Sequence, residues 1–398
     1  MRFSLAIAAL PVALVAASPA GKRCTGTISS LDDVAAAQKC TTININAFTV
    51  PAGKTFAISA LDGTTINMLG DVRFGVANWP GPLFSITGNK LVFNGNGHTF
   101  DGQGASYWDG QGGNGGVTKP HPMMKIKMSG TYSNVKVLNS PAHVYSISNP
   151  AALVMSKLTM MKIKMSGTYS NVKVLNSPAH VYSISNPAAL VMSKLTIDNS
   201  AGDKANSKSG GKAAGHNTDG FDVSTTDLTI EDSTIHNQDD CIAINRGSNI
   251  IFQRNTCTGG HGISIGSVSA DATVKNIQVL NNKIIDNDQA LRIKTKADAT
   301  NASVTNVVFN GNTATGIRRF GVIVDQSYPS TLGTAGNNVV MSDISFGTNN
   351  IAVTSDAQRV AVDCGSKCTG TWDWSGLKVT GGQAGKIYNY KNIKAGSY

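Results

Sequence analysis

Three short segments of this chain repeat at a fixed interval of 21 residues. They are DGFDVS, DCIAIN and HGISIG, which begin at Asp219, Asp240 and His261. In each segment apolar residues alternate with other residues, as in a β-strand that buries one face, and the apolar positions of the three segments coincide. A constant spacing of strands, with no helix between them, is typical of stacked coils. This spacing limits the chain to few folds.

A second series of apolar segments runs through the same region. It comprises LTIEDS (228–233), IIFQRN (250–255), IQVLNN (277–282) and VVFNGN (307–312), and Gly, Asn and Asp mark the turns between segments. Each repeat therefore contains two or more short strands, which predicts a parallel β-helix with coils about 4.8 Å apart. The alternative is an antiparallel β-sandwich, but its strands have no reason to keep a constant spacing.

The composition agrees with an all-β protein. Of the 24 acidic residues only Glu231 is a glutamate, and Asn, Ser, Thr and Gly are abundant. These residues favour turns over helices. We see no linker and no change of composition after the N-terminal leader, so we predict a single β-helix domain over residues 24–398.

The first 20 residues have the pattern of a secretory signal peptide, with one early arginine, a short apolar core and small residues after it. Residues 21–23 are a candidate short propeptide. No later segment is apolar enough to cross a bilayer, so we expect a secreted, extracellular protein with no membrane partner.

The charge of the chain indicates the class of partner. The formal net charge of +10 falls to +7 when Arg2, Lys22 and Arg23 are removed with the leader. A basic surface attracts polyanions. We expect no nucleic acid partner, because Lys and Arg do not cluster with aromatic residues. An acidic polysaccharide suits an exported protein better, although the charge could also serve solubility alone.

Six cysteines in an exported chain favour disulfides. Pairing of sequence neighbours would give Cys24–Cys40, Cys241–Cys257 and Cys364–Cys368, although other connectivities are open. The sequon Asn301-Ala302-Ser303 predicts a glycan on Asn301. No Cys/His spacing resembles a zinc site, and we expect no metal.

The equal spacing should bring ionisable side chains together. Asp219, Asp240 and His261 hold the same place on successive coils, so we expect them to form a column on one face. Asp239 can share their cleft only if the backbone bends at the entrance of the strand, because adjacent strand residues point to opposite faces. Like charges this close raise the pKa of at least one carboxyl, which provides an acid and a base for glycoside hydrolysis.

Two cations belong to the same predicted face. Arg292 and Lys294 alternate with the apolar Leu291 and Ile293, so both should point outward from one strand. Cations beside the carboxylates suit an acidic sugar, whereas a neutral hexose has little use for them.

Four segments together resemble the signature blocks of the polygalacturonase family of glycoside hydrolases. They are HNTDGFDVS (216–224), NQDDCIAIN (237–245), GGHGISIGS (259–267) and RIK (292–294). The segments YWDGQG (107–112) and VIVDQSYPS, which contains Tyr328, are also similar to this family. The resemblance covers almost the whole mature chain and is closest to the secreted fungal endopolygalacturonases. The four blocks in this order are specific, whereas any single block would be weak.

The resemblance implies a right-handed parallel β-helix that hydrolyses the α-1,4 linkages of polygalacturonan in pectin with inversion, without a cofactor. Asp239 would donate the proton to the leaving oxygen. Asp219 and Asp240 would activate the water, and His261 would maintain the proton donor.

The resemblance also implies the residues that bind the substrate. Arg292 and Lys294 would bind a galacturonate carboxylate, and Asn217 and Tyr328 would contact the sugar. Beyond pectin, we expect a monomer whose partners could include plant inhibitor proteins.

Other functions remain open. An exo-acting enzyme or a rhamnogalacturonan hydrolase would have similar blocks. A pectate lyase would share fold and substrate but use Ca²⁺ and β-elimination. A pectin-binding paralogue impaired by an internal duplication would not hydrolyse at all.

That duplication is perfect: residues 123–159 are repeated without substitution as residues 160–196. A local coil needs about 23 residues, so 37 residues are more than one coil and fewer than two. We consider two hypotheses, one extra coil with an irregular loop or an error in the assembly of the sequence. In both cases we expect the catalytic coils to be intact and the YWDGQG loop to be displaced along the solenoid. Deleting 160–196 should then improve stability or the binding of long substrates.

Overall fold

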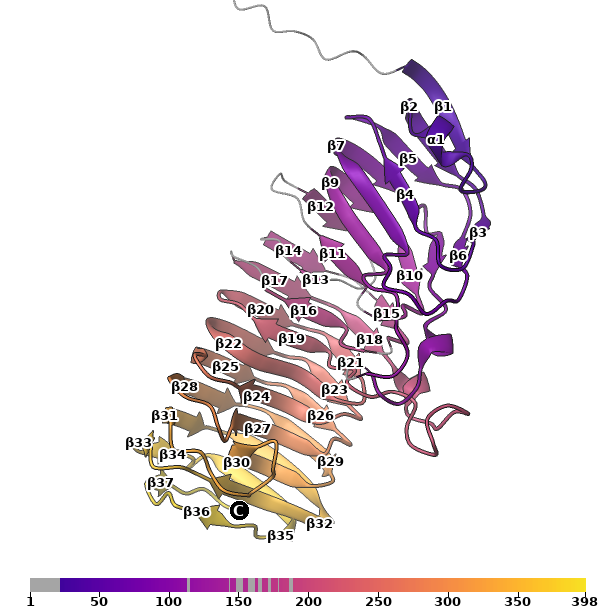
Figure 1. Ribbon diagram of the computed structural model, residues 1–398. Helices are drawn as coiled ribbons and strands as arrows, with labels where there is room; N and C mark the ends of the chain where they lie inside the picture. The colour runs from indigo at the N-terminus through magenta and orange to yellow at the C-terminus, as the bar shows by residue number, and fades with distance from the viewer. Residues whose placement is uncertain are drawn as a thin grey trace, which may run out of the picture.

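The chain forms a right-handed parallel β-helix, as the spacing and the resemblance predicted. The computed structural model describes residues 22–112, 115–142, 144–147, 153–156, 162–163, 167–170, 173–177, 179–185 and 189–398. Neighbouring coils pair through parallel strands, which stack into one long solenoid (Figure 1). The parallel pairing excludes the antiparallel β-sandwich.

The first coils lie at one end of the solenoid, where the short helix α1 packs beside β1 (Figure 1). Their elements are β1 (Lys22–Ile28), α1 (Val34–Ala37), β2 (Cys40–Ile45), β3 (Phe48–Val50), β4 (Phe56–Ser59), β5 (Thr65–Met68), β6 (Val72–Phe74), β7 (Phe84–Asn94), β8 (Thr99–Asp101) and the 3-10 helix η1 (Gly104–Tyr107).

The central coils contain both copies of the duplicated segment. Their elements are β9 (Met124–Ser133), β10 (Lys136–Leu138), β11 (Tyr145–Ile147), β12 (Leu153–Ser156), β13 (Lys162–Ile163), β14 (Gly167–Ser170), β15 (Lys173–Leu175), β16 (Tyr182–Ile184), β17 (Leu190–Ser193), β18 (Thr196–Asp198) and the 3-10 helix η2 (Ser200–Gly202).

The remaining coils carry the repeated blocks and the C-terminus. Their elements are β19 (Phe221–Ser224), β20 (Leu228–Glu231), β21 (Thr234–His236), β22 (Asp240–Gln253), β23 (Thr256–Thr258), β24 (Gly262–Val268), β25 (Thr273–Leu280), β26 (Lys283–Ile285), β27 (Gln289–Lys296), β28 (Ala302–Asn310), β29 (Thr313–Ile317), β30 (Phe320–Tyr328), β31 (Val339–Phe346), β32 (Asn349–Asp363), β33 (Cys368–Thr369), β34 (Trp372–Asp373), β35 (Leu377–Gln383), β36 (Ile387–Tyr388) and β37 (Ile393–Lys394).

The 21-residue register predicted from the sequence is the register of the sheet. Phe221 of β19 pairs with Ile242 of β22, which pairs with Ile263 of β24. All three side chains are fully buried. The burial of such apolar columns along the whole solenoid supplies the hydrophobic driving force for stacking the coils.

A ladder of buried asparagines closes one turn of each coil. Asn255 donates to Asn282, Asn282 to Asn312, and Asn312 to Asn349, over 3.2, 2.9 and 2.8 Å respectively. Three of these residues end or follow the second series of apolar segments. In this turn each side-chain amide satisfies polar groups that would otherwise be buried without a partner.

The duplicated segment adds two strand positions to the sheet of β9, whereas one of our two hypotheses was a single extra coil with an irregular loop. At one register position the sheet carries Lys125, Ser146, Lys162 and Ser183 in successive coils. The steps are 21, 16 and 21 residues, so the coil between β11 and β13 is five residues shorter than its neighbours. The 37 residues are accommodated as one short coil and one ordinary coil.

The YWDGQG loop is not displaced from the later coils, contrary to our expectation. Lys208 Nζ donates to the carbonyl oxygen of Ser106, 2.7 Å away. Gly112 has a φ of +56°, and a Cβ there would lie only 2.1 Å from the carbonyl oxygen of His216. Because only glycine fits this approach, the loop packs against the segment that leads into the first signature block.

The three disulfides form between sequence neighbours, as predicted: Cys24–Cys40, Cys241–Cys257 and Cys364–Cys368. The predicted signal peptide and Gly21 lie outside the described residues. Within the described part of the chain, no helix has the length and apolar character needed to span a membrane.

Candidate active site

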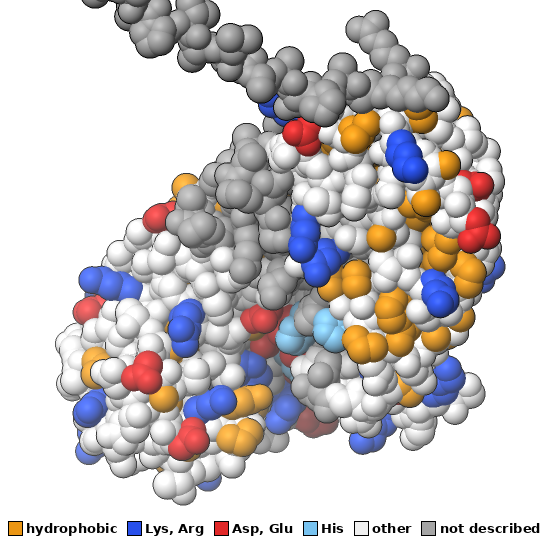
Figure 2. Space-filling model, turned by 45° about the horizontal axis from the view of Figure 1, so that its top comes forward, with side chains coloured by type: hydrophobic (Ala, Val, Ile, Leu, Met, Phe, Trp, Pro, Cys, Tyr) orange, Lys and Arg blue, Asp and Glu red, His pale blue; other side chains and the backbone are white. Residues whose placement is uncertain are grey.

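The eight residues that we selected for the site line one cavity of about 540 Å³: Asn217, Asp219, Asp239, Asp240, His261, Arg292, Lys294 and Tyr328. The cavity lies on the outer face of the sheet formed by β19, β22, β24, β27 and β30. Figure 2 shows a hollow in the surface where acidic and histidine side chains gather. The structure thus places residues that are up to 111 positions apart in one cleft.

The backbone bends where the second block enters its strand. β22 begins at Asp240, and Asp239 lies in the bend before it. The register then shifts by one residue, so Asp240 pairs with Gly262 rather than with His261. The simple column that we predicted is therefore wrong at this point. The shift places His261 beside Asp239, whose carbonyl oxygen accepts the His261 backbone N–H at 2.8 Å.

Asp239 and His261 form a hydrogen-bonded ion pair. His261 Nδ1 lies 2.9 Å from Asp239 Oδ1, and Asn217 Nδ2 donates to the other carboxylate oxygen over 3.2 Å. Burial opposes charge on both groups. The hydrogen bond and the mutual attraction outweigh it, so the pKa of Asp239 is lowered and the pKa of His261 is raised. In the free site the shared proton therefore belongs to His261.

Asp240 is held as an acceptor by two donors. Lys294 Nζ lies 2.7 Å from Oδ2, and the Ser264 hydroxyl donates to Oδ1 over 2.6 Å. The side chains of Lys294 and Asp240 are only 9% and 2% exposed, so this is a buried ion pair. These contacts fix the orientation of Asp240 and stabilise its negative charge.

Asp219 has a different environment. Its Oδ1 is buried and has no hydrogen-bond partner among the described residues, although His180 Nε2 lies 3.5 Å away. Burial raises the pKa of Asp219 well above the usual range, and repulsion from Asp239 and Asp240 raises it further. The site thus contains carboxyl groups whose environments drive their pKa values apart, as acid/base catalysis requires.

The cationic end of the cleft is built from Arg292, Lys294 and Tyr328. The Tyr328 ring centroid lies 6.0 Å from the Arg292 guanidinium carbon and 5.3 Å from Lys294 Nζ. Such contacts hold the cations over the ring face. Arg292 Nε is buried without a partner among the described residues. A guanidinium with an unused donor is suited to a carboxylate ligand.

Three residues of the site were missed in the sequence. His180 and Asp222 line the cleft, with His180 Nδ1 3.7 Å from Asp222 Oδ2, and Ser264 contacts Asp240. Alternation within the blocks was the available signal for two of them, because Asp222 and Ser264 share the register column of Arg292. His180 comes from the duplicated segment, and no motif pointed to it.

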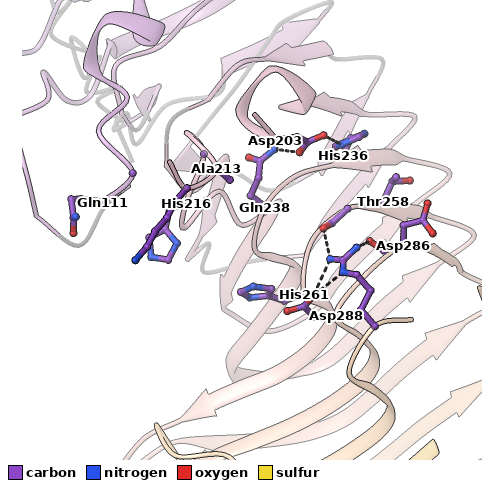
Figure 3. A pocket seen from close by; sticks show the side chains of 15 residues that line it. Gln111, Asp203, Ala213, His216, His236, Gln238, Thr258, His261, Asp286 and Asp288 are labelled. Atoms are coloured by element: carbon purple, nitrogen blue, oxygen red, sulfur yellow. Dashed lines mark hydrogen bonds and ion pairs between the residues drawn. The ribbon is translucent and has the colours of Figure 1, made fainter. Parts of the chain in front are cut away.

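His261 also lines a second cavity of about 680 Å³, which Figure 3 shows. In that cavity His236 Nε2 lies 2.8 Å from Asp203, and Arg318 Nε donates to Asp288 over 3.0 Å. The Asp288 carboxylate favours the charged imidazole and contributes to the raised pKa of His261. Asp288, which lines the second cavity, therefore stabilises the protonated form of His261.

Asp239, Asp240 and His261 offer ligand atoms within 4.8 Å of one another, which is a geometry that could hold a metal ion. However, His261 already bonds Asp239, and Lys294 already neutralises Asp240. A cation inside this cluster would have to displace both contacts. The donor set is better explained as an acid/base cluster than as a metal centre.

The chain is similar to proteins of one enzyme family. The model of "Glycosyl hydrolases family 28" matches residues 40–166 and again 157–397. Each match contains one complete copy of the duplicated segment, so the family pattern accommodates a single copy. Endopolygalacturonase B of Aspergillus oryzae is 36% identical over 100% of this chain and 99% of its own length. The polygalacturonase of Saccharomyces cerevisiae is 40% identical over 94% of this chain and 92% of its own.

Solved structures give the same result. Endopolygalacturonase I from Stereum purpureum, in complex with two galacturonate molecules, is 41% identical, with a TM-score of 0.66 over 94% of this chain and 99% of that one. The endo-xylogalacturonan hydrolase from Aspergillus tubingensis is 21% identical, with a TM-score of 0.52 over 94% of this chain and 100% of that one. The second similarity supports the fold alone.

Proposed function

The chain belongs to glycosyl hydrolases family 28, and from this membership we propose that its cleft hydrolyses the α-1,4-galacturonosyl linkages of polygalacturonan within the chain, with inversion. The observation that supports this most directly is the cluster of Asp219, Asp239 and Asp240 beside Arg292 and Lys294 in one cavity. The carboxyl groups provide acid and base, and the cations provide a site for an acidic sugar.

In this mechanism Asp239 protonates the leaving oxygen. We place the proton of the free site on His261 Nδ1, 2.9 Å from Asp239 Oδ1, because the pKa of His261 is raised and that of Asp239 is lowered. Transfer along this bond gives a neutral Asp239 carboxyl and a neutral imidazole. His261 therefore acts as the proton reservoir of the donor, and activity should be lost when His261 is deprotonated.

Asp240 and Asp219 activate the attacking water. Asp240 is fixed by Lys294 and Ser264, which orients its remaining lone pairs. Asp219 can share the proton that the water releases, because its pKa is raised by burial and by its acidic neighbours. Water attack on one face and protonation of the leaving group on the other produce inversion.

The raised pKa of Asp219 also supports a second assignment, in which Asp219 is the acid and Asp240 the base. The two assignments can be separated with a galacturonoside that has a good leaving group, such as a nitrophenolate. Such a substrate does not need protonation of the leaving group, so the variant that lacks the acid keeps most of its activity.

The test compares Asp239→Asn with Asp219→Asn. We expect each variant to lose at least about a hundredfold in polygalacturonan hydrolysis. With the activated substrate, Asp239→Asn should recover and Asp219→Asn should not. The reverse pattern would assign the acid to Asp219. Unchanged polygalacturonan hydrolysis by Asp239→Asn would refute the role of Asp239 as the proton donor.

Measurements on the native protein separate the remaining alternatives. A rapid loss of viscosity per bond cut indicates endo action, whereas slow loss with release of single sugars indicates an exo enzyme. An unsaturated product and a need for Ca²⁺ would indicate a lyase. We propose that chelation of divalent ions leaves the activity unchanged.

The setting of the enzyme is also part of the proposal. The apolar leader of residues 1–20 and the three disulfides support secretion into an oxidising compartment. Asn301 is exposed at the entrance of β28, where a glycan would not meet the cleft sheet. We propose that the enzyme acts as a monomer and that plant inhibitor proteins are candidate partners.

A further inference from the structure

One wall of the catalytic cleft is formed by residues 326–333, which end β30 and continue into the loop that follows it. We call these residues the wall segment. Three of them line the cavity of the catalytic carboxyl groups: Tyr328, Pro329 and Thr331. The Tyr328 ring also lies beside both cations of the cleft. The shape of the cationic end therefore depends on how the wall segment is held.

Asp325, the residue directly before the wall segment, binds this segment at two points. Its Oδ1 accepts hydrogen bonds from the backbone N–H and the hydroxyl of Ser327, over 2.8 and 2.6 Å. Its Oδ2 accepts the backbone N–H of Leu332 over 3.0 Å. Tyr328 lies in the chain between these two points. Asp325 is only 2% exposed, so its charged carboxylate forms strong hydrogen bonds that water does not weaken.

Ser327 passes this constraint on to the loop. Its hydroxyl donates to Asp325 and, with a lone pair, accepts the backbone N–H of Gly333 over 2.9 Å. The carbonyl oxygen of Gln326 accepts the backbone N–H of Gly336, also over 2.9 Å. Three successive residues at the end of β30 thus bind the loop as it returns past them, and the Asp325 carboxylate orients the central one.

Leu332 attaches the wall segment to the sheet by apolar contact. Its side chain packs against a cluster of Phe320, Ile323 and Ala361, which is separate from the core of the solenoid. Ile323 pairs with Arg292, so the cluster covers the sheet immediately beyond the cleft. The attachment is the C-terminal end of the wall.

The backbone of Leu332 is strained. Its φ is +52°, and among the described residues it is the one aliphatic residue with a positive φ. Residues other than Gly, Asn and Asp adopt this left-handed conformation rarely, and it persists only where surrounding contacts hold it. The hydrogen bond to Asp325 and the apolar cluster are the contacts that hold Leu332.

A second buried aspartate lies beside Asp325 but does not bind the wall segment. Asp363 of β32 pairs in register with Asp325 of β30, and the two strands lie near the C-terminal end of the solenoid (Figure 1). Asp363 is 4% exposed, and its Oδ2 has no hydrogen-bond partner among the described residues. Burial, and next repulsion from Asp325, raise the pKa of Asp363. Asp363 therefore provides a matched control for Asp325.

Resting on the proposed hydrolysis of polygalacturonan, we propose that Asp325 is a positioning residue of the active site: together with the Leu332 contact, its carboxylate holds Tyr328 and the wall segment in the conformation that receives the substrate. Asp325 does not line the cleft and acts through the wall segment. When the Asp325 contact is lost, the strained backbone of Leu332 relaxes and the wall is closed for only part of the time.

This role affects KM more than kcat. The apparent affinity for substrate falls in proportion to the fraction of molecules whose wall is closed. The catalytic carboxyl groups are unchanged, so the bound substrate reacts at nearly the native rate. A residue that only stabilised the fold would behave differently. Its loss would lower the concentration of folded enzyme, and with it the maximal rate, at an unchanged KM.

The first test compares Asp325→Asn with Asp363→Asn on polygalacturonate. In Asp325→Asn the charge is lost and the amide nitrogen opposes one of the N–H donors. We expect KM to rise about tenfold, which corresponds to a wall that is closed about a tenth of the time, with kcat nearly unchanged. Asp363→Asn should keep the native KM and kcat, because an amide resembles the neutral carboxyl that the raised pKa favours.

The second test compares Leu332→Ala with Leu332→Met. The alanine variant keeps the strained backbone position but loses most of the contact with the apolar cluster, so its KM should also rise. The methionine variant keeps an apolar side chain of similar volume and should have a nearly native KM. Leu332 is only partly buried, so these variants decide the question if Asp325→Asn does not fold.

Equal KM values for Asp325→Asn and Asp363→Asn would overturn the positioning role. A lower maximal rate at the native KM would assign Asp325 to stability alone and would also overturn it. If Leu332→Ala and Leu332→Met had the same KM, the contact with the apolar cluster would have no part in holding the wall.

Hydrogen exchange tests the same contacts without any activity. The backbone N–H groups of Leu332 and Gly333 should exchange faster in Asp325→Asn than in Asp363→Asn, because their acceptors are lost or freed. Equal exchange rates in the two variants would overturn the proposal. Failure of the native protein to hydrolyse polygalacturonate would instead refute the proposed function, and the exchange rates would still decide whether Asp325 holds the wall.

Discussion

The buried pair of Lys294 and Asp240 makes a prediction about stability as well as catalysis. In Lys294→Met the aliphatic stem is nearly preserved and the ammonium group is lost. The Asp240 carboxylate, whose side chain is 2% exposed, then keeps the Ser264 hydroxyl as its one hydrogen-bond donor among the described side chains. Removing one partner of a buried ion pair costs about 3–5 kcal/mol. Because the Ser264 hydrogen bond remains, we expect Lys294→Met to lower the free energy of unfolding by about 3 kcal/mol.

The assay is urea unfolding at neutral pH, followed by tryptophan fluorescence. Lys294→Met/Asp240→Asn should recover a large part of the loss, since the uncompensated charge is gone, with a coupling of at least about 2 kcal/mol between the sites. Lys394→Met is the matched control, because the Lys394–Asp373 pair is exposed on both sides, and its stability should be nearly native. A loss below about 1 kcal/mol in Lys294→Met, or additive losses in the double variant, would refute the reasoning.

Three further predictions follow from the site and the coils. His261→Gln should lower kcat at least about tenfold and move the alkaline limb of the pH profile of kcat to lower pH. The reason is that the raised pKa of His261 keeps the proton donor supplied at pH values above the ordinary histidine range. The control is His236→Gln, which changes a residue of the second cavity and should leave the alkaline limb in place. Cys241→Ala/Cys257→Ala removes a disulfide that joins cysteines 16 residues apart. It should lower the free energy of unfolding, measured by chemical denaturation, by about 3 kcal/mol. An unchanged free energy of unfolding would contradict a stabilising role of this disulfide. Deletion of 160–196 should raise the midpoint of thermal unfolding, because it removes the short coil between β11 and β13; a lower midpoint would show that the added coils stabilise the solenoid.

Deletion of residues 160–196 would leave one copy of the duplicated segment. Each of the two family matches likewise contains one copy of this segment. Its junction joins Thr159 to Ile197, which is the same dipeptide as Thr196-Ile197 in the native chain. His180 would be replaced by the identical His143. Comparing the deletion variant with the native protein therefore tests the effect of the added coils without a change of the local sequence at the junction.

Much of this protein was determined by the sequence itself. The 21-residue spacing specified the parallel coils, because a strand that buries alternate residues can stack on its neighbours only if equivalent positions return at equal intervals. The same spacing predicted that Asp219 and Asp240 lie on successive coils, and the alternation within residues 291–294 predicted that Arg292 points outward. Pairing of sequence neighbours was one of several cysteine connectivities that the sequence left open, and it is the one that the structure contains.

Only the tertiary structure decided how the ionisable groups of the site are paired. The one-residue register shift at the entrance of β22 put His261 beside Asp239, and the sequence period gave no sign of it. The proximity of His180 to Asp219 depends on the pairing of β16 with β19 across a long intervening loop, which periodicity alone did not settle. Protonation states depend on burial and on charges from several coils at distances of a few ångströms. Those distances are set by backbone bends and stacking, so the sequence could name the catalytic groups but not which of them holds the proton.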